Sequence, residues 1–443
     1  MGYNLLKKSA LLTLEVMVAP IMLVLATPIL LKYLGTYNYG VYLLILSISI
    51  SMNLINQGIP SLIVKKISEF RHKNIDDISK FYSTVFVFQL SLILILLLLL
   101  LAMLLGASLF DSGSDGSIIK KLLLLSIPMM LIEMLSFNLI SIHRGYERFD
   151  RALLASLFEK VVKYGVLIYV VIATSNMFYI FMYGLLSAAF LFVAHSVLIK
   201  CWYREIFFFK YCSYDMLSSI KAISVWAWVL GMVGLISLQL DKWFVGYYFG
   251  YEILAVYGLA IMIFGQLHTF NSASIAWILP EVSKNGFTKE NVRRYSTLPI
   301  YILMSSCLAV FLVHKFEFLF ISWLGAEQYS SAEKYIDVAT ALLPVYAATL
   351  VPQYYLVATG MFKKHTQIDS VILITKGILL ITVVRLFDVY HVAYILCTLA
   401  LISSFMYQFE LYKVGLKSKN IIIQLVTPLM GFIVTLSILN SLI

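Results

Sequence analysis

The chain has 443 residues, of which 61% are hydrophobic and only 13% charged, and its formal net charge at pH 7 is +10. This composition excludes a soluble globular protein, in which about a quarter of the residues are charged. Apolar stretches of roughly 20 residues follow one another along almost the whole sequence. They predict an all-α polytopic membrane protein, because the strands of a membrane barrel are about half as long.

Thirteen apolar segments are predicted as membrane spans. They cover residues 9–31, 40–63, 82–105, 120–142, 155–174, 177–199, 217–240, 253–279, 297–314, 337–359, 367–385, 391–412 and 421–442. A charged and aromatic stretch, 200–217, separates the first six spans from the next six. We therefore expect a six-helix bundle over 1–205, a cytoplasmic linker over 206–216, a second six-helix bundle over 217–415 and an additional C-terminal membrane segment over 416–443.

The two predicted halves resemble each other at an offset of 215 residues. The matching positions are Gly35 with Gly250, Tyr42 with Tyr257, and Gly145 with Gly360. Six spans in each half insert both halves with the same orientation, so the repeat is predicted to be parallel, with the two bundles related by a pseudo-twofold axis.

Lysine and arginine are concentrated in alternate loops. The basic residues that lie before the first span or follow even-numbered spans include Lys7, Lys8, Lys65, Lys66, Arg144, Arg148, Arg151, Lys200, Lys284, Arg293, Arg294, Lys363, Lys364, Lys413 and Lys417. Short loops that retain basic residues are cytoplasmic, so the N-terminus is predicted to lie in the cytoplasm. The positive charge is explained by topology, and no nucleic-acid partner is expected.

The sequence contains no motif for a metal, a cofactor or a hydrolytic site. There is no GxxxxGK[ST] segment, no HExxH and no GxSxG, and the four cysteines lack metal or redox spacing. No cleavable signal peptide is visible, since the first apolar run lacks a small-x-small cleavage site. The loops are too short to fold as separate domains. We therefore expect a protein that is not an enzyme and whose function resides in its membrane helices.

Several charged side chains lie inside the predicted spans, where each costs on the order of 3 kcal/mol on insertion scales. Glu159 and Lys163 lie four residues apart, in the order that favours an ion pair on one helix face. Lys376 lies in the middle of its span without an acidic neighbour within one turn, which favours a position in a cavity. Glu15 and Glu133 are interpreted either as hydrogen-bonded core residues or as sites of ion coupling.

Asp241 and Lys242 end the seventh span, and snorkelling at the outer membrane surface would explain both. The histidines His195 and His314 have no supporting pattern and are interpreted as structural.

A stripe of polar side chains recurs in the second and eighth spans. Its members are Ser51, Asn53, Asn56 and Gln57 in the first half and Gln266, His268 and Asn271 in the second. Such residues can simply join helices, each contributing about 0.6 kcal/mol. Their recurrence in both halves favours the alternative that they line a common cavity.

Five segments together resemble the bacterial polysaccharide and O-antigen flippases. They are KKSALLTLEVMVAPIMLVLATPILLKYLGTYNYGVY, NQGIPSLIVKKISE, HRGYERFDRALL, SLQLDKWFVGYYFGYEILAVYGLA and WLGAEQYSSAEKYIDVATALLP. The resemblance covers essentially residues 1–413 and rests on diffuse motifs. It implies membership of the multidrug/oligosaccharidyl-lipid/polysaccharide exporter superfamily, whose two six-helix bundles form a V around a central cavity. The thirteenth span departs from the 12 or 14 helices of that superfamily.

The resemblance implies a flippase that moves an oligosaccharide linked to undecaprenyl diphosphate across the bacterial inner membrane, with a polysaccharide polymerase and a chain-length regulator as candidate partners. Lys163 and Lys376 suit the diphosphate as cationic donors, while Asn53, Asn56, Gln57, Gln266, His268 and Asn271 suit sugar hydroxyls. Glu15, Glu133, Glu159 and Asp241 are the candidates for ion coupling, and His268 could also carry a proton. An ion-coupled multidrug exporter, or a flippase for a teichoic-acid or peptidoglycan precursor, are the alternatives.

Overall fold

The computed structural model describes residues 2–51, 56, 59–70, 75–108, 114–203, 206, 225–275, 277–414 and 421–442. Helices dominate these residues, and no strand occurs among them. The chain divides into two compact units, residues 1–231 and 232–443, and the boundary falls inside α8 (Val225–Tyr248). All but Ile206 of the predicted linker, 206–216, lies outside the described residues.

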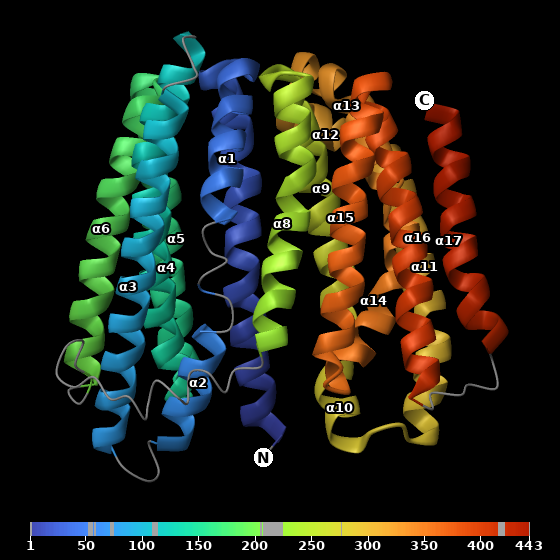
Figure 1. Cartoon of the computed structure of the whole chain (residues 1–443), viewed down its shortest axis with the longest axis horizontal. Coiled ribbons are helices and arrows are strands. Elements are labelled where there is room, and N and C mark those ends of the chain that lie inside the picture. Colours follow the sequence, from blue (N-terminus) through green and yellow to red (C-terminus); the bar gives the residue numbers. More distant parts are fainter. Residues whose placement is uncertain are drawn as a thin grey trace. The chain divides into compact units, whose positions relative to one another are not determined.

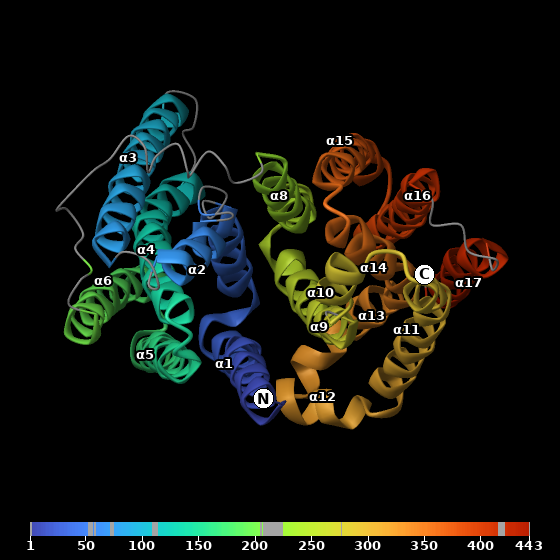
Figure 2. The ribbon, with the colours of Figure 1, turned by 90° about the horizontal axis from the view of Figure 1, so that it is seen from below.

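The N-terminal unit is built around α4 (Figures 1 and 2). Its helices are α1 (Gly2–Ser51), α2 (Ile59–Phe70), α3 (Ile75–Ser108), α4 (Ser114–Gly145), α5 (Phe149–Thr174) and α6 (Met177–Trp202). Helix α4 packs against the other five, and α1 packs against α5. The core between α2, α3, α4 and α6 contains Ile63, Phe81, Ile127 and Leu139, all fully or almost fully buried.

The C-terminal unit is built around α14, which Figure 2 shows surrounded by its neighbours. After α8 the helices are α9 (Tyr251–Ile275), α10 (Ile278–Asn285), α11 (Lys289–Lys315), α12 (Glu317–Leu324), α13 (Ala326–Thr340), α14 (Leu343–Ala358), α15 (Phe362–Leu386), the 3₁₀ turn η2 (Val389–His391), α16 (Val392–Lys413) and α17 (Ile421–Leu442). Helix α17 packs against α14, α16, α11 and α13, so the additional C-terminal segment is in contact with the other helices of this unit.

Eight helices of the described residues are long and apolar enough to span a membrane, or nine if the bent pair α13–α14 counts as one span. This confirms a polytopic α-helical membrane protein. One of the predicted spans is not a single straight helix: the span predicted over 337–359 bends by 41° between α13 and α14. Pro344 explains the bend, since it lies in the first turn of α14, where a missing N–H is tolerated. Within the span predicted over 40–63, residues 52–55, 57 and 58 lie outside the described part of the chain.

The 215-residue offset is visible in the backbone at Gly35 and Gly250, but not at Gly145 and Gly360, of which only Gly360 has a positive φ. Helix α1 is two helical segments joined at Gly35, whose φ is +75°, and α8 is joined to α9 at Gly250, whose φ is +88°. A left-handed conformation of this kind favours glycine. The paired tyrosines Tyr42 and Tyr257 are both buried. The pseudo-twofold axis and the V shape stay predictions.

Candidate functional site

A polar cavity of about 290 Å³ lies inside the C-terminal unit, among α8, α9, α14, α15 and α16. Polar and apolar side chains share its wall, and Asp369 and Lys376 are the lining residues that carry a full charge. The polar lining consists of Ser237, His268, Tyr346, Thr349, Gln353, Asp369, Lys376, Ser403 and Tyr407. A liquid water takes about 30 Å³, so the space would hold on the order of ten waters or a single ring-sized group.

Lys376 is joined to α8 by two strong contacts. Its Nζ lies 2.9 Å from Asp241 Oδ1 and donates a 2.7 Å hydrogen bond to the carbonyl oxygen of Ser237. The second oxygen of Asp241 accepts a 2.5 Å hydrogen bond from the hydroxyl of Tyr257 on α9. Lys376 and Asp241 are only 5% and 4% exposed. The prediction of a deeply placed Lys376 is consistent with this geometry, but its ammonium is already neutralised.

The expectation that Asp241 and Lys242 snorkel at the membrane surface is wrong for Asp241. The carboxylate is buried, because a lysine from a helix 135 residues later in the chain supplies its counter-charge. Lys242 instead donates to Gln239 one turn earlier on α8, at 3.2 Å.

Asp369 on α15 faces the same cavity two helical turns before Lys376. One of its oxygens accepts a hydrogen bond from the Tyr407 hydroxyl on α16, and that hydroxyl accepts a 3.2 Å hydrogen bond from Gln353 on α14. The other oxygen lies 3.5 Å from Nε2 of His365, one turn earlier on α15. Three helices therefore meet at this carboxylate.

Among the described residues of the predicted polar stripe, His268 is the one that lines the cavity. Its ring stacks on Phe264 at 5.7 Å between centroids and meets the edge of Tyr346 at 5.8 Å. Aromatic walls of this kind suit a flat-faced ligand group.

The amides Asn56 and Asn271 join helices rather than facing this cavity. The side-chain oxygen of Asn56 accepts hydrogen bonds from Gln89 on α3 and Asn138 on α4, at 3.0 and 2.9 Å. Asn271 bonds to Ser305 and Ser306 on α11, at 3.1 and 2.9 Å. Both amides are buried, and their sequence positions differ by the same 215 residues as the other matching pairs.

The other predicted site residues are distributed as follows. Gln266 is half-buried on α9 and is not among the residues that line the cavity. Asn53, Gln57 and the side chain of Glu15 lie outside the described part of the chain.

In the N-terminal unit, Lys163 on α5 pairs with Glu133 on α4 at 2.6 Å. The predicted ion pair between Glu159 and Lys163 is wrong, because Glu159 pairs with the adjacent Lys160. Sequence spacing favours the intrahelical pair, but α4 offers Lys163 a closer partner across the helix interface. Both residues of the Glu133–Lys163 pair are half-buried.

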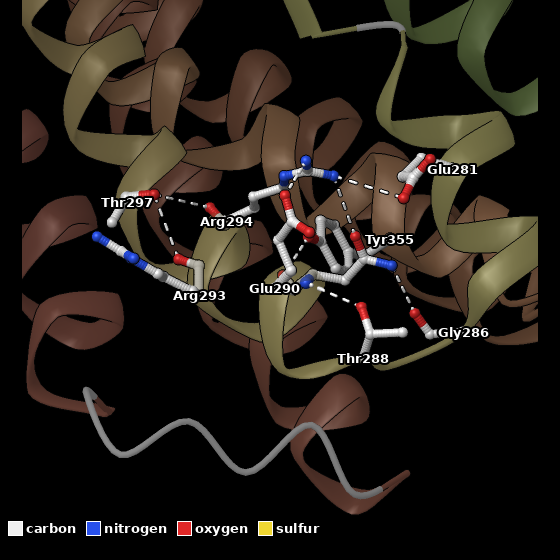
Figure 3. A network of polar contacts seen from close by, with 9 residues as sticks. Glu281, Gly286, Thr288, Glu290, Arg293, Arg294, Thr297 and Tyr355 are labelled. Carbon is white, nitrogen blue, oxygen red and sulfur yellow. Dashed lines mark hydrogen bonds and ion pairs between the residues drawn. The ribbon is translucent and has the colours of Figure 1, made fainter.

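One of the cavity helices, α14, is held at one end by the polar network in Figure 3. Arg294 on α11 lies 3.5 Å from Glu281 of α10, pairs with Glu290 and covers the ring of Trp277. The Tyr355 hydroxyl of α14 donates a 2.6 Å hydrogen bond to the carbonyl oxygen of Asn291. Because Tyr355 lies two residues after Gln353, this network fixes the part of α14 that faces the cavity.

The HRGYERF segment, at the turn between α4 and α5, is also held in place by contacts of its arginines. The Arg148 guanidinium hydrogen-bonds Asp150 and holds the pKa of that carboxyl below its usual range. Arg151 covers the rings of Trp202 and Tyr203 at 4.8 and 5.6 Å, which fastens the end of α6 to this turn.

Sequence reasoning missed Asp369, Tyr407 and Gln353. A signal for the first was present, since His365, Asp369 and Lys376 follow helical spacing and so share one face of α15. The tyrosine and the glutamine gave no such signal, because their importance depends on which helices pack together.

Packed membrane helices around a half-open cavity that combines polar and apolar side chains are typical of membrane transporters. The comparisons with known proteins agree. Residues 5–285 match the family described as polysaccharide biosynthesis protein, which is more than half of the chain. The chain belongs to this family, and the resemblance expected from the sequence is confirmed.

Solved structures share the fold at low identity. The lipid II flippase MurJ in an inward closed conformation has 16% identity and a TM-score of 0.64, over 96% of this chain and 98% of that one. A point mutant of the Vibrio cholerae MATE transporter VcmN has 12% identity and a TM-score of 0.64, over 94% and 98%. An inward-facing multidrug resistance MATE family transporter of the MOP superfamily has 12% identity and a TM-score of 0.61, over 97% and 95%.

A comparison with curated protein sequences finds no match. Family and fold together identify a multi-pass membrane protein of the polysaccharide biosynthesis family that has the fold of these transporters.

Proposed function

We propose that this protein is a flippase that moves an oligosaccharide linked to undecaprenyl diphosphate from the cytoplasmic to the periplasmic leaflet of a bacterial inner membrane. The observation that carries the proposal is the polar cavity within the membrane helices of a polysaccharide biosynthesis protein. The hydroxylated, anionic head of such a substrate cannot cross hydrocarbon unaided, whereas its polyprenyl tail can stay in lipid.

The chemistry of the cavity suits the sugar part of this substrate. Gln353, Thr349 and Ser403 offer neutral hydrogen-bonding groups, and Tyr346 and His268 offer ring faces. The Asp369 carboxylate can accept hydrogen bonds from sugar hydroxyls, and bonds to a charged acceptor are roughly twice as strong as neutral ones.

The diphosphate is assigned to the lysines Lys376 and Lys163. Each is paired with a carboxylate, at 2.9 and 2.6 Å respectively, so a phosphate oxygen has to replace that carboxylate. Lys163 is the more accessible of the two, with 29% of its side chain exposed against 7% for Lys376. We therefore place the first phosphate contact at Lys163.

Transport is proposed to proceed by alternating access of the two units, with the N-terminus in the cytoplasm. Moving one negative charge outward across an inside-negative membrane releases about 2.3 kcal/mol per 100 mV, so the potential can drive a diphosphate. A polysaccharide polymerase and a chain-length regulator are the proposed downstream partners.

Two related functions compete with this one. The MATE transporters share the fold, and Asp369 would suit an organic cation, which favours multidrug export. The likeness to a lipid II flippase favours a peptidoglycan precursor, and a teichoic-acid precursor is a related candidate.

Reconstitution into proteoliposomes tests the proposal. The probe is a polyprenyl-diphosphate-linked disaccharide with a fluorophore on the sugar, and dithionite added outside quenches only the outer leaflet. We expect the protein to make the inner-leaflet fraction accessible within minutes. Efflux of a cationic dye without flipping of the probe would select the drug exporter instead.

A further inference from the structure

A second pocket, of about 460 Å³, lies within the N-terminal unit, and the proposed transport cycle does not use it. It is larger than the cavity of about 290 Å³ in the C-terminal unit. Three segments that are far apart in the chain form its wall: α1 just after Gly35, the start of α4, and the turn between α5 and α6. At about 30 Å³ per water, the pocket would hold on the order of fifteen waters or one polar group of that size.

The lining of this pocket combines polar and apolar side chains. Ile118 on α4 and Phe178 on α6 supply apolar surface and are 54% and 45% exposed, a pattern expected where a pocket borders the lipid. The polar part of the lining consists of Asn38, Lys121, Ser175 and Asn176. A pocket of this composition suits an amphipathic ligand that has a polar head and apolar chains.

Lys121 is the cation of this pocket. Among the described residues no carboxylate lies within ion-pair distance of its ammonium, whereas Lys163 of the same unit pairs with Glu133 at 2.6 Å. A lysine ammonium is a compact donor that binds phosphate as a point charge. Lys121 is exposed, so an anion can reach it without displacing a protein group.

Two amides of the lining keep hydrogen-bonding groups available. Asn38 donates to the carbonyl oxygen of Leu34 at 3.0 Å, and its side-chain oxygen accepts no hydrogen bond from the described residues. The side-chain oxygen of Asn176 accepts from the N–H of Phe178 at 2.9 Å, which leaves its NH₂ group without a partner in the described part of the chain. The pocket therefore offers an acceptor and a donor in addition to the lysine.

The pocket lies at the end of the unit that is opposite the basic HRGYERF turn. Helix α5 connects the two, since it begins at Phe149 in that segment and ends at Thr174, next to Ser175 of the pocket. The basic residues predict a cytoplasmic position for the HRGYERF turn, so the pocket is expected at the outer surface of the membrane.

Exposed tyrosines indicate that the pocket lies at the depth of the lipid headgroups. Tyr33 and Tyr37 come shortly before Asn38, and Tyr179 follows Phe178; they are 37%, 42% and 43% exposed. Tyrosine is enriched where the hydrocarbon of a membrane meets water. A ligand of this pocket would therefore place its polar head among the headgroups of the outer leaflet.

Lysines at this end of the unit depart from the distribution of charge in the rest of the half. Lys32, Lys120 and Lys121 lie at the edges of the predicted outer loops, which otherwise hold few basic residues. Lys32 lies shortly before Gly35, at the same turn of α1 as the pocket. An anionic group bound at this surface would account for lysines on the side of the membrane where they are disfavoured.

We propose that this pocket binds the head of an anionic phospholipid from the outer leaflet. Lys121 pairs with the phosphate, while Asn38 and Asn176 bind the polar group that is esterified to it. The acyl chains lie against Ile118 and Phe178. The site is separate from the cavity of the C-terminal unit, so the inference goes beyond the proposed function and does not depend on it.

Native mass spectrometry of the full chain in detergent tests the proposal, because it resolves the protein with and without a bound lipid. The probe is phosphatidylglycerol, whose head carries one negative charge. The wild type should bind it more tightly than phosphatidylcholine, whose choline cation Lys121 repels. In Lys121→Gln the dissociation constant of phosphatidylglycerol should rise about fivefold, which corresponds to about 1 kcal/mol for one lysine near a lipid surface. Lys121→Arg keeps the charge and should stay within about twofold of the wild type.

The matched control is Lys315→Gln, which removes an exposed lysine from the end of α11, also predicted to lie at the outer surface. This variant should bind phosphatidylglycerol within about twofold of the wild type. Equal affinity of the wild type for the two lipids, or an unchanged dissociation constant in Lys121→Gln, overturns the proposal. An equal loss in Lys315→Gln does so as well, because binding would then follow net charge alone.

A second variant, Asn176→Asp, adds a negative charge to the pocket. Aspartate keeps an acceptor for the N–H of Phe178 at the start of α6, so thermal unfolding should not change. The affinity for phosphatidylglycerol should fall about fivefold, because the new carboxylate repels the phosphate. Unaltered affinity in this variant would contradict a phosphate bound beside Asn176.

Two competitors separate the phospholipid from other sources of phosphate. Millimolar inorganic phosphate should leave phosphatidylglycerol bound, since it lacks the chains that contact Ile118 and Phe178, and full displacement would assign the pocket to a free anion instead. The polyprenyl-diphosphate-linked disaccharide should also leave the lipid bound, and displacement would make the pocket part of the transport path. Either displacement overturns the proposal. None of these measurements requires transport, so their outcome is independent of the test of the proposed function.

Discussion

Lys376 on α15 lies 2.9 Å from Asp241 on α8, and both side chains are almost fully buried. Neither residue can be assigned a role alone. A buried pair repays its desolvation only if the geometry is good and the remaining polar atoms are satisfied. Here the Ser237 carbonyl and the Tyr257 hydroxyl supply those additional bonds.

Lys376→Met should destabilise the protein by about 3–5 kcal/mol, because Asp241 is left as a buried charge without its cation. The double variant Lys376→Met with Asp241→Asn should recover most of that loss. Thermal unfolding of the purified protein in detergent measures both. Additive losses in the double variant would show that the pair is not coupled. A loss of export in a Lys376 variant can be assigned to substrate binding only when the double variant is also inactive.

The second prediction separates two candidate partners of Lys163. In a double-mutant cycle, Glu133→Gln and Lys163→Met should show a coupling of about 1 kcal/mol, because the pair is half-buried and partly screened. The same cycle with Glu159→Gln should show little coupling, since Glu159 pairs with Lys160. Unfolding free energies of the single and double variants give both values. A coupling energy with Glu159 that exceeds the one with Glu133 would instead support the intrahelical pair between Glu159 and Lys163.

The third prediction concerns the two glycines at matching positions. Gly35→Ala and Gly250→Ala should each destabilise by about 1–2 kcal/mol, because a Cβ disfavours the left-handed backbone there. Apart from the local backbone and the adjacent residues, no atom lies within 4 Å of the position of the added Cβ at either site, so the cost comes from the backbone conformation and not from packing against the rest of the protein.

Gly165→Ala is the control for this pair, because Gly165 also has open space around it but lies within α5. Alanine is the better helix former by about 1 kcal/mol, so this variant should be neutral or more stable. Equal effects at all three sites in thermal unfolding would contradict the conformational explanation.

The fourth prediction tests the packing of α17. A Cβ at Gly431 would lie 2.6 Å from the carbonyl oxygen of Pro344 on α14, and a backbone atom cannot move aside cheaply. Gly431→Ala should therefore destabilise the C-terminal unit by about 1–3 kcal/mol. Gly265→Ala on α9, where the space is open, is the matched control. Unchanged thermal unfolding of Gly431→Ala would mean that α17 is not held closely against α14.

The fifth prediction distinguishes packing from sugar binding at Asn271. Asn271→Ala should lower stability by about 0.5–2 kcal/mol, since Ser305 and Ser306 lose their partner. The affinity for the disaccharide probe should stay within about twofold. Loss of affinity at unchanged stability would instead place this amide among the ligand contacts.

The sequence was sufficient for the helical membrane fold and for the family, because both depend on hydropathy and on motifs that are local in the chain. The bend between α13 and α14 was harder to predict, although Pro344 marks it. The ion-pair partners of the buried lysines could not be predicted from the sequence. Lys376 meets a carboxylate 135 residues away, and Lys163 meets one 30 residues away on another helix. Spacing along one helix gives no information on such partners.

The separation of 135 residues between Asp241 and Lys376 also matters for biogenesis. Helix α8 is synthesised before α15 exists, so at the translocon its aspartate has no counter-charge from Lys376. Its insertion then costs at most about 2.5–3.5 kcal/mol, the value for a charged residue at the centre of a span. The apolar residues of α8 alone must therefore make the free energy of its insertion favourable. The ion pair contributes only in the later step, when the inserted helices associate, and it then selects α15 as the neighbour of α8.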